Sequence, residues 1–329
     1  MSTIYEGFRD AATRHRDKAA ILVPERADLP FGRLLQFVDS ARSSLHEKSV
    51  GRHSRVGAIF PDRAQAAVAH LVCVSTCVSL PMNPALTPDE LRSGVINMGI
   101  EALLVSDQLD PGLLNAAQDS GVQVIVASSD SSTAGLFNLA VHGSAAGRWN
   151  ADLELPDKTD ISVLLQTSGT SARPKIVPQT QLSRVTMIDR ISKALKIGPN
   201  DRCVNVMPMH HTSGLTGEFL APMLSGAAVV FVPFNPTTMV DSLIRYQATW
   251  FSAVPTMHQA IVESLNHRSG VLGGTKVRFA SARHPSSALC CVIDLNAPTE
   301  YQCLSSTDRA KPASWLLLGY RARRSRLVP

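Results

Sequence analysis

A run of small hydroxyl residues directly after an apolar segment constrains this chain more than any other feature. Residues 161–165, Ile-Ser-Val-Leu-Leu, are apolar apart from one serine and predict a buried strand. Four hydroxyl side chains and a glycine then occupy positions 167–171, and Lys175 follows four residues later. Such residues fill a core poorly, but their exposed backbone N–H groups can surround an anion while the lysine supplies a point charge. The segment therefore predicts a triphosphate-binding loop at the end of a strand.

The spacing of this loop excludes two common nucleotide-binding motifs. A Walker loop ends in Gly-Lys-Ser/Thr, whereas Lys175 lies between Pro174 and Ile176, and the pattern Gly-x-Gly-x-x-Gly is also absent. Because Pro174 fixes φ and lacks an N–H donor, we expect the chain not to enter a helix directly at this point. An ordinary Ser/Thr-rich surface turn remains the alternative.

The residues before the loop indicate the fold class. Strand-like apolar runs alternate with helical patterns, which predicts an α/β protein with mixed sheets covered by helices. Thr87, Pro88 and Glu90 match the N-cap, first and third positions of a helix. Residues 128–158 are rich in Ser, Ala, Gly and Asp and predict a loop or linker.

The loop resembles that of the adenylate-forming enzymes, the acyl-CoA synthetase and AMP-binding superfamily, usually written Thr-Ser-Gly-Thr-Thr-Gly-x-Pro-Lys-Gly. Ala172 and Ile176 stand where that motif has glycines. Residues 80–91, Leu-Pro-Met-Asn-Pro-Ala-Leu-Thr-Pro-Asp-Glu-Leu, are similar to the superfamily's Val-Pro-Leu-Asn-Pro-x-Leu-Thr-Pro-Glu-Glu-Leu. A generic nucleotide-binding domain would not be expected to repeat these prolines and the asparagine in order.

Three later segments extend the resemblance. Residues 208–215 are similar to Pro-Leu-x-His-x-x-Gly-Leu, and residues 249–257 to Thr-x-x-x-x-Val-Pro-Thr-Met. Residues 277–289 follow Arg-x-x-Ser-Ala-Pro-Leu-Pro-x-x-x-Leu, although Arg283 and His284 replace the first Pro-Leu pair. The adjacent histidines of the first segment have no carboxylate or cysteine at helical or hairpin spacing, so no metal site is predicted.

The resemblance implies the site residues and the cofactors, which are ATP, Mg²⁺ and CoA. The expected phosphate-binding residues are Thr167, Ser168, Gly169, Thr170, Ser171 and Lys175, with Lys175 also catalytic; Ala282 would contact the adenine, and His211, Val254 and Pro255 would contact a small carboxylic acid. A hydrogen-bonded loop histidine is the alternative for His211.

Beyond Leu289 the resemblance fades. We find no Tyr-Gly-x-Thr-Glu, no Thr-Gly-Asp, no hinge and no small C-terminal domain with its lysine. We therefore expect the N-terminal part of the adenylate-forming fold, with the C-terminal domain missing or supplied by a separate chain. Residues 1–289 would form a partial AMP-binding domain, and residues 290–329 a divergent basic tail that could be disordered.

Charge and composition limit the classes of protein to which the chain could belong. The net charge of +5 is carried entirely by residues 305–329, which hold six basic residues and one acid, so no nucleic-acid partner is expected. The 44% hydrophobic content is ordinary, and no apolar run is long enough to span a membrane. The six cysteines fit neither a disulfide framework nor a Cys-x-x-Cys metal site. With no secretory signal at the start, we expect a cytoplasmic protein.

Three hypotheses about function follow. The first is an acyl-CoA synthetase-like ligase, truncated and of doubtful activity on its own. The second is a catalytically inactive nucleotide-binding module or relic. The third is a chain whose sheet is incomplete, which would unfold without cooperativity.

Overall fold

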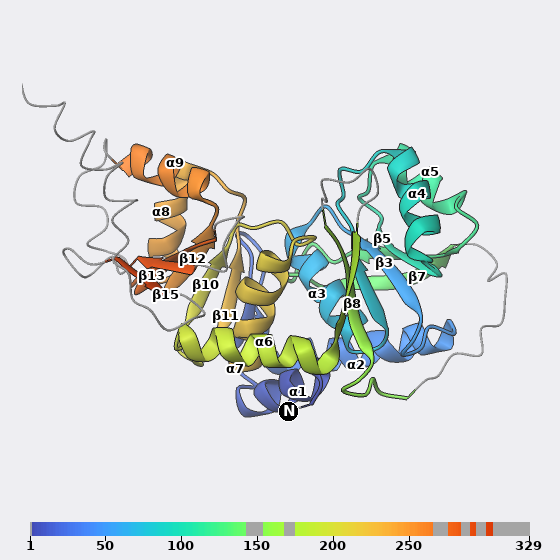
Figure 1. Cartoon of the computed structure of the whole chain (residues 1–329), viewed down its shortest axis with the longest axis horizontal. Coiled ribbons are helices and arrows are strands. Elements are labelled where there is room, and N and C mark those ends of the chain that lie inside the picture. Colours follow the sequence, from blue (N-terminus) through green and yellow to red (C-terminus); the bar gives the residue numbers. More distant parts are fainter. Residues whose placement is uncertain are drawn as a thin grey trace, which may run out of the picture. The chain divides into compact units, whose positions relative to one another are not determined.

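A computed structural model describes residues 2–142, 154–167, 175–265, 276–283, 290–293 and 301–304 (Figure 1). The chain divides into two compact units. Unit 1 comprises Met1–Asp201 and Met207–Phe231, and unit 2 comprises Arg202–Val206 and Val232–Pro329.

The elements of unit 1 follow in chain order. They are α1 (Ile4–Arg14), β1 (Ala19–Leu22), β2 (Leu29–Pro30), α2 (Phe31–Glu47), β3 (Arg55–Ile59), α3 (Arg63–Val74), β4 (Val78–Pro81), α4 (Pro88–Met98), β5 (Ala102–Ser106), α5 (Pro111–Gln118), β6 (Gln123–Ser129), β7 (Phe137–His142), β8 (Ile161–Thr167), β9 (Lys175–Thr180), α6 (Gln181–Ala194), the π-helix η1 (Ser213–Leu220), α7 (Ala221–Ser225) and β11 (Ala228–Phe231).

Unit 2 contains the remaining elements. They are β10 (Arg202–Asn205), α8 (Pro236–Arg245), β12 (Trp250–Ala253), α9 (Pro255–Leu265), β13 (Phe279–Arg283), β14 (Cys290–Ile293) and β15 (Tyr301–Leu304).

The larger sheet of unit 1 has the strand order β7-β6-β5-β3-β4-β8-β9 among the described residues. The inner strands are parallel, whereas β7 and β9 run antiparallel to their neighbours at the two edges. The sheet is therefore mixed, as the alternation of strands and helices predicts. Helices α4 and α5 cover one face, where Leu91, Val95 and Leu113 pack with Leu80 and Leu103 in an apolar cluster.

Helix starts follow the local sequence closely. The Thr87 side chain accepts from the backbone N–H of Glu90, the Glu90 carboxylate accepts from the N–H of Thr87, and Pro88 occupies the first turn. The predicted capping box is confirmed. Thr3 and Glu6 form the same box at the start of α1, so both helices begin where their side chains satisfy the free backbone donors.

The expectation of a loop over residues 128–158 is wrong for part of that range. Strand β7 lies inside it and pairs with β6. Phe137 is buried, with its ring 5.0 Å from Phe37 and 5.4 Å from Phe60 between centroids. A short apolar run within Ser/Gly-rich sequence thus finds aromatic partners that are distant along the chain.

The described strands of unit 2 lie in the order β15-β14-β13-β12-β10. Strands β10, β12 and β13 are parallel, and β14 and β15 are antiparallel additions. The last two strands fall within residues 290–329, the stretch expected to be a divergent tail, while residues 305–329 lie outside the described part.

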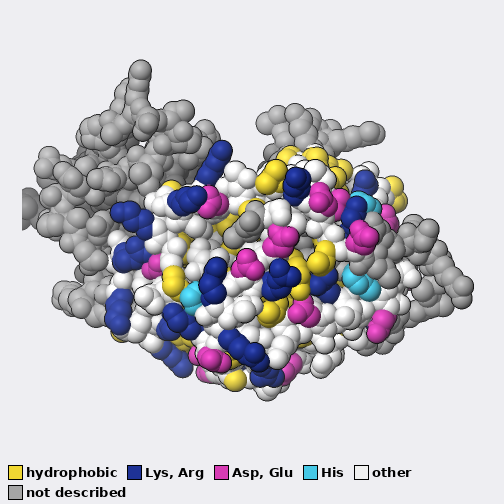
Figure 2. All heavy atoms as spheres, turned by 90° about the horizontal axis from the view of Figure 1, so that it is seen from below, with side chains coloured by type: hydrophobic (Ala, Val, Ile, Leu, Met, Phe, Trp, Pro, Cys, Tyr) yellow, Lys and Arg dark blue, Asp and Glu magenta, His cyan; other side chains and the backbone are white. Residues whose placement is uncertain are grey.

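Figure 2 shows acidic side chains lying among the basic ones over the face in view.

Within the described part of the chain, none of the helices is both long enough and apolar enough to cross a bilayer.

Candidate functional site

The expected phosphate loop connects two antiparallel strands of unit 1. Strand β8 ends at Thr167, β9 begins at Lys175, and the backbones of these two residues are directly paired. The absence of a helix after Pro174 is thereby confirmed. Because β8 is parallel to β4, Thr167 lies at the carboxyl end of parallel strands, where open α/β sheets bind ligands. Four expected phosphate-binding residues lie outside the described part of the chain: Ser168, Gly169, Thr170 and Ser171.

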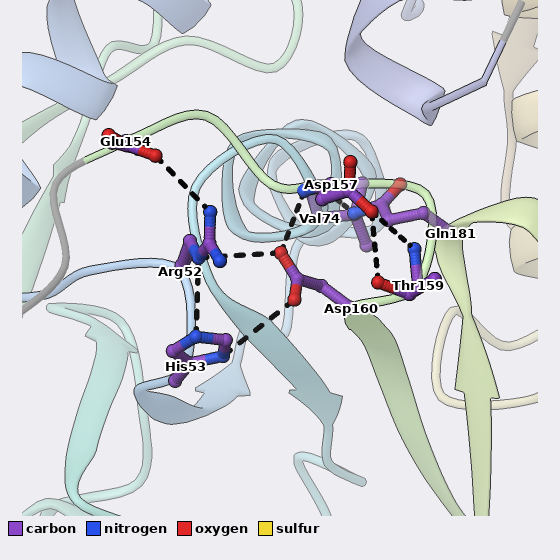
Figure 3. Close-up of polar contacts among 8 residues, drawn as sticks. All are labelled: Arg52, His53, Val74, Glu154, Asp157, Thr159, Asp160 and Gln181. Carbon is purple, nitrogen blue, oxygen red and sulfur yellow. Dashed lines mark hydrogen bonds and ion pairs between the residues drawn. The ribbon is translucent and has the colours of Figure 1, made fainter.

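A polar cluster closes the opposite end of this hairpin (Figure 3). The backbone N–H of Gln181 donates to the carbonyl of Asp160 at 2.9 Å, which joins the start of α6 to the start of β8. The Asp160 carboxylate accepts from the N–H of Asp157 at 2.7 Å and lies 3.6 Å from Arg52 Nε and 3.9 Å from His53 Nδ1. The entry to β8 and the exit from β9 are therefore held together.

The buried amide of Gln181 extends this attachment to two further helices. Its Oε1 accepts from the backbone N–H of Ile4 at 3.1 Å, and its Nε2 donates to the carbonyl of Val74 at 2.8 Å. Ile4 begins α1 and Val74 ends α3. One fully buried side chain thus satisfies two helix-terminal groups that would be costly to leave unpaired.

Two buried polar side chains, His70 and Arg184, contact β4 and β9 from the face of the sheet opposite α4 and α5. Ser79, Val163 and Gln179 lie side by side on β4, β8 and β9. His70 of α3 places Nδ1 2.8 Å from Ser79 Oγ, and Arg184 of α6 donates from Nη1 to Gln179 Oε1 at 2.9 Å. Burial, and secondarily the Arg184 charge, hold the pKa of His70 well below its usual range. This histidine is a neutral structural group.

His211 lies in a tight turn that leads into η1. Its N–H donates to the carbonyl of Pro208 at 3.2 Å, and its carbonyl accepts from the N–H of Leu215 at 3.1 Å. A Cβ atom on Gly214 would lie 2.5 Å from the Pro208 oxygen, so this position accepts no side chain without a backbone shift. The turn presents His211 as an exposed residue.

The neighbouring histidine has a different environment. The rings of His210 and His211 lie 4.3 Å apart between centroids at an interplanar angle of 51°. Burial, and then the nearby His211, lower the pKa of His210 to about 4, so this imidazole is neutral near pH 7. In the described ranges, no group of three or more His, Cys, Asp or Glu side chains could hold a metal ion.

Two charged residues that the sequence patterns did not indicate contact this region. Arg63, at the start of α3, donates from Nη2 to the carbonyl of Met207 at 2.7 Å. Burial lowers the pKa of Arg63 to about 10, and the carboxylate of Glu218 opposes that shift. Glu218 lies in η1 and is only 1% exposed. The sequence could have indicated Glu218, because it is the single glutamate within the mainly apolar run 214–224. A carboxylate buried in such a run needs a partner.

The remaining expected site residues lie in unit 2. Ala253 and Ala282 pair on β12 and β13, so Ala282 is beside the end of β12 and close to Val254. Helix α9 begins at Pro255, one residue beyond Val254 and the end of β12. The Val254 carbonyl accepts from the N–H of Met257 at 2.9 Å, and proline suits the first helical position.

Comparisons with known proteins agree with this fold. A family model described as AMP-binding enzyme matches residues 8–318. A probable CoA ligase, CCL9, from Humulus lupulus is 30% identical over 78% of this chain and 50% of its own length. An oxalate–CoA ligase from Arabidopsis thaliana is 28% identical over 78% of this chain and 51% of its own. The chain thus spans about half the length of these curated relatives.

A solved structure gives the same result for the fold. The ATP-bound MatB from Rhodopseudomonas palustris is similar with a TM-score of 0.70 at 17% identity, over 90% of this chain and 62% of that one. The architecture is therefore that of the N-terminal part of an adenylate-forming enzyme. The chain belongs to the AMP-binding enzyme family, whose CoA ligase members use ATP and CoA to convert acids into CoA thioesters.

Proposed function

We propose that this chain is an acyl-CoA synthetase-like ligase, or a part of one, that activates a small carboxylic acid with ATP. The observation that carries this proposal is the pairing of Thr167 with Lys175 at the carboxyl end of the parallel strands, within a match to the AMP-binding family. The pairing returns Lys175 to the point where the hydroxyl-rich loop begins.

The proposed reaction has two steps. A carboxylate oxygen attacks the α-phosphorus of ATP, the bond to the β-phosphate breaks, and pyrophosphate leaves. The sulfur of CoA, having lost its proton, then attacks the acyl carbon, and AMP leaves with the bonding electrons. Backbone N–H groups, the hydroxyls and Lys175 would neutralise the charge that develops on the departing phosphates.

The other roles are assigned within each unit. In unit 1, His211 is exposed on its turn and would contact the acid. In unit 2, Val254 and Pro255 would line the acyl pocket, and the backbone near Ala282 would contact the adenine. Among the described residues, no group of three or more His, Cys, Asp or Glu side chains lies together, and no step is assigned to Mg²⁺.

The test is ATP–pyrophosphate exchange by the full chain with a panel of acids. Oxalate is tried first because one relative is named an oxalate–CoA ligase. We expect exchange with at least one acid and a loss of about hundredfold in Lys175→Ala. Lys158→Ala is the matched control, since Lys158 is an exposed lysine in the segment leading to the same hairpin.

Calorimetry with MgATP separates the alternatives. Binding of ATP without exchange would favour a nucleotide-binding module, and neither binding nor exchange would contradict both functions. Thermal unfolding without cooperativity would instead indicate a chain that does not fold by itself.

A further inference from the structure

The position of Arg63 is unusual for its local sequence. Asp62 is the N-cap of α3, and Arg63 occupies the first helical position. A positive charge at a helix N-terminus is unfavourable, because the backbone N–H groups there carry partial positive charge. A residue that breaks a local rule is expected to gain stabilisation or function elsewhere.

Arg63 contacts the residue that immediately precedes the histidine turn. Its Nη2 donates to the Met207 carbonyl at 2.7 Å, which is a short charge-assisted hydrogen bond. Met207 immediately precedes Pro208, whose carbonyl accepts from the N–H of His211. The guanidinium is thus separated from the His211 backbone by two consecutive peptide units.

Glu218, on the other side of the turn, carries a negative charge that acts on Arg63. It lies in η1, the helix that begins after His211, and its buried carboxylate interacts electrostatically with Arg63. Gly214, between the two points, packs so closely on the Pro208 carbonyl that a Cβ would be 2.5 Å away. A wide π-helical turn is itself an arrangement found frequently at functional sites.

We propose that Arg63 is a positioning residue for the His210–His211 turn. It holds the Met207 carbonyl where the turn begins and attracts the Glu218 carboxylate of the helix that follows. The residue need not touch a substrate. Its consequence for the acid rests on the proposed function: a displaced His211 would weaken binding of the acid and leave binding of ATP unchanged.

The decisive measurement is the imidazole region of the NMR spectrum of the full chain. His210→Asn and His211→Asn identify the two signals. We expect Arg63→Met to shift both signals, and Arg63→Lys to shift them less because lysine keeps the charge but not the planar donor group. Arg55→Met is the matched control, since Arg55 also donates to a methionine carbonyl, that of Met98 at 3.2 Å.

Signals of Arg63→Met that coincide with those of the unmodified chain would overturn the proposal. So would equal shifts in Arg55→Met, which would indicate a general loosening of the unit. If Arg63→Met does not fold, Glu218→Gln replaces it, and unchanged histidine signals in that variant would overturn the proposal equally.

The exchange assay adds a second readout. Arg63→Met should raise KM for the acid about tenfold and change KM for ATP by less than about twofold. An equal rise in both constants would contradict a positioning role. If no acid supports exchange in the unmodified chain, the proposed function fails, and the imidazole signals still decide the role of Arg63.

Discussion

Arg184 of α6 donates from Nη1 to Oε1 of Gln179 on β9 at 2.9 Å, and this bond ties the outer strand of the phosphate-loop hairpin to the helix that follows it. Arg184 is fully buried. Among the described strands of its sheet, β9 is an edge with β8 as its neighbour. The contact from α6 is therefore a second attachment, from outside the sheet, for the strand that begins at Lys175.

Replacing Arg184 should loosen the hairpin more than it affects the rest of unit 1. Arg184→Met leaves Gln179 without this donor, and we expect the free energy of unfolding to fall by about 1–3 kcal/mol. Hydrogen exchange of the β9 amides should accelerate more than that of β5. Lys193→Met is the control on the same helix, because the Lys193–Asp189 ion pair is exposed and worth at most about 0.5 kcal/mol. Unchanged protection of β9 would contradict this role.

Gly214 should tolerate no side chain. In Gly214→Ala the new Cβ would lie 2.5 Å from the Pro208 oxygen, so the backbone must move and carry the histidine turn with it. We expect a loss of about 1–3 kcal/mol in urea unfolding. Gly198→Ala is a matched control, because nothing lies within 4 Å of a Cβ built at Gly198. Equal stability of the two variants would show that the contact is relieved without cost.

Features set by neighbouring residues were predictable from the sequence. The Thr87–Glu90 capping box depends on four consecutive positions, and the strand before the hydroxyl-rich loop depends on one apolar run. The same holds for the absence of a helix after Pro174, which follows from the geometry of proline.

Features that depend on partners distant in the sequence were not predictable from it. In β7, Phe137 is buried and its ring lies against those of Phe37 and Phe60, which are distant from it in the sequence. The contact between Arg63 and Met207 joins residues 144 positions apart, and no local pattern encodes it. Such pairs become visible only when the topology has brought α3 beside η1, which a single sequence does not specify.

The Gln181 amide should contribute strongly to stability because it satisfies two buried backbone groups at once. Gln181→Leu removes the acceptor for the Ile4 N–H and the donor to the Val74 carbonyl, and we expect a loss of about 2–4 kcal/mol. Gln108→Leu, at an exposed position of the same unit, should change stability by less than about 0.5 kcal/mol. The free energies of unfolding of the two variants are compared by urea denaturation, with one m-value used for both.

The low pKa of His210 predicts how stability depends on pH. Burial, and then His211, lower this pKa to about 4, whereas an unfolded histidine titrates near about 6.5. Between these values the unfolded chain binds the additional proton, so stability is fully present above pH 6.5 and is lost as the pH falls toward 4. The free energy of unfolding should fall by less than roughly 1.4 kcal/mol per pH unit, which is the value when the unfolded chain binds one full proton that the folded chain does not. The change should be smaller because His210 is only partly buried.

His210→Asn isolates this contribution, because the buried His70 titrates equally in both proteins and cancels. The stability of the unmodified chain relative to His210→Asn should decrease steadily from pH 6.5 to 4. His211→Asn should make the decrease smaller, since removing the neighbouring imidazole raises the pKa of His210 while burial, the larger cause, remains. A difference that stays constant across this range would mean that His210 titrates in the folded chain as it does in the unfolded one.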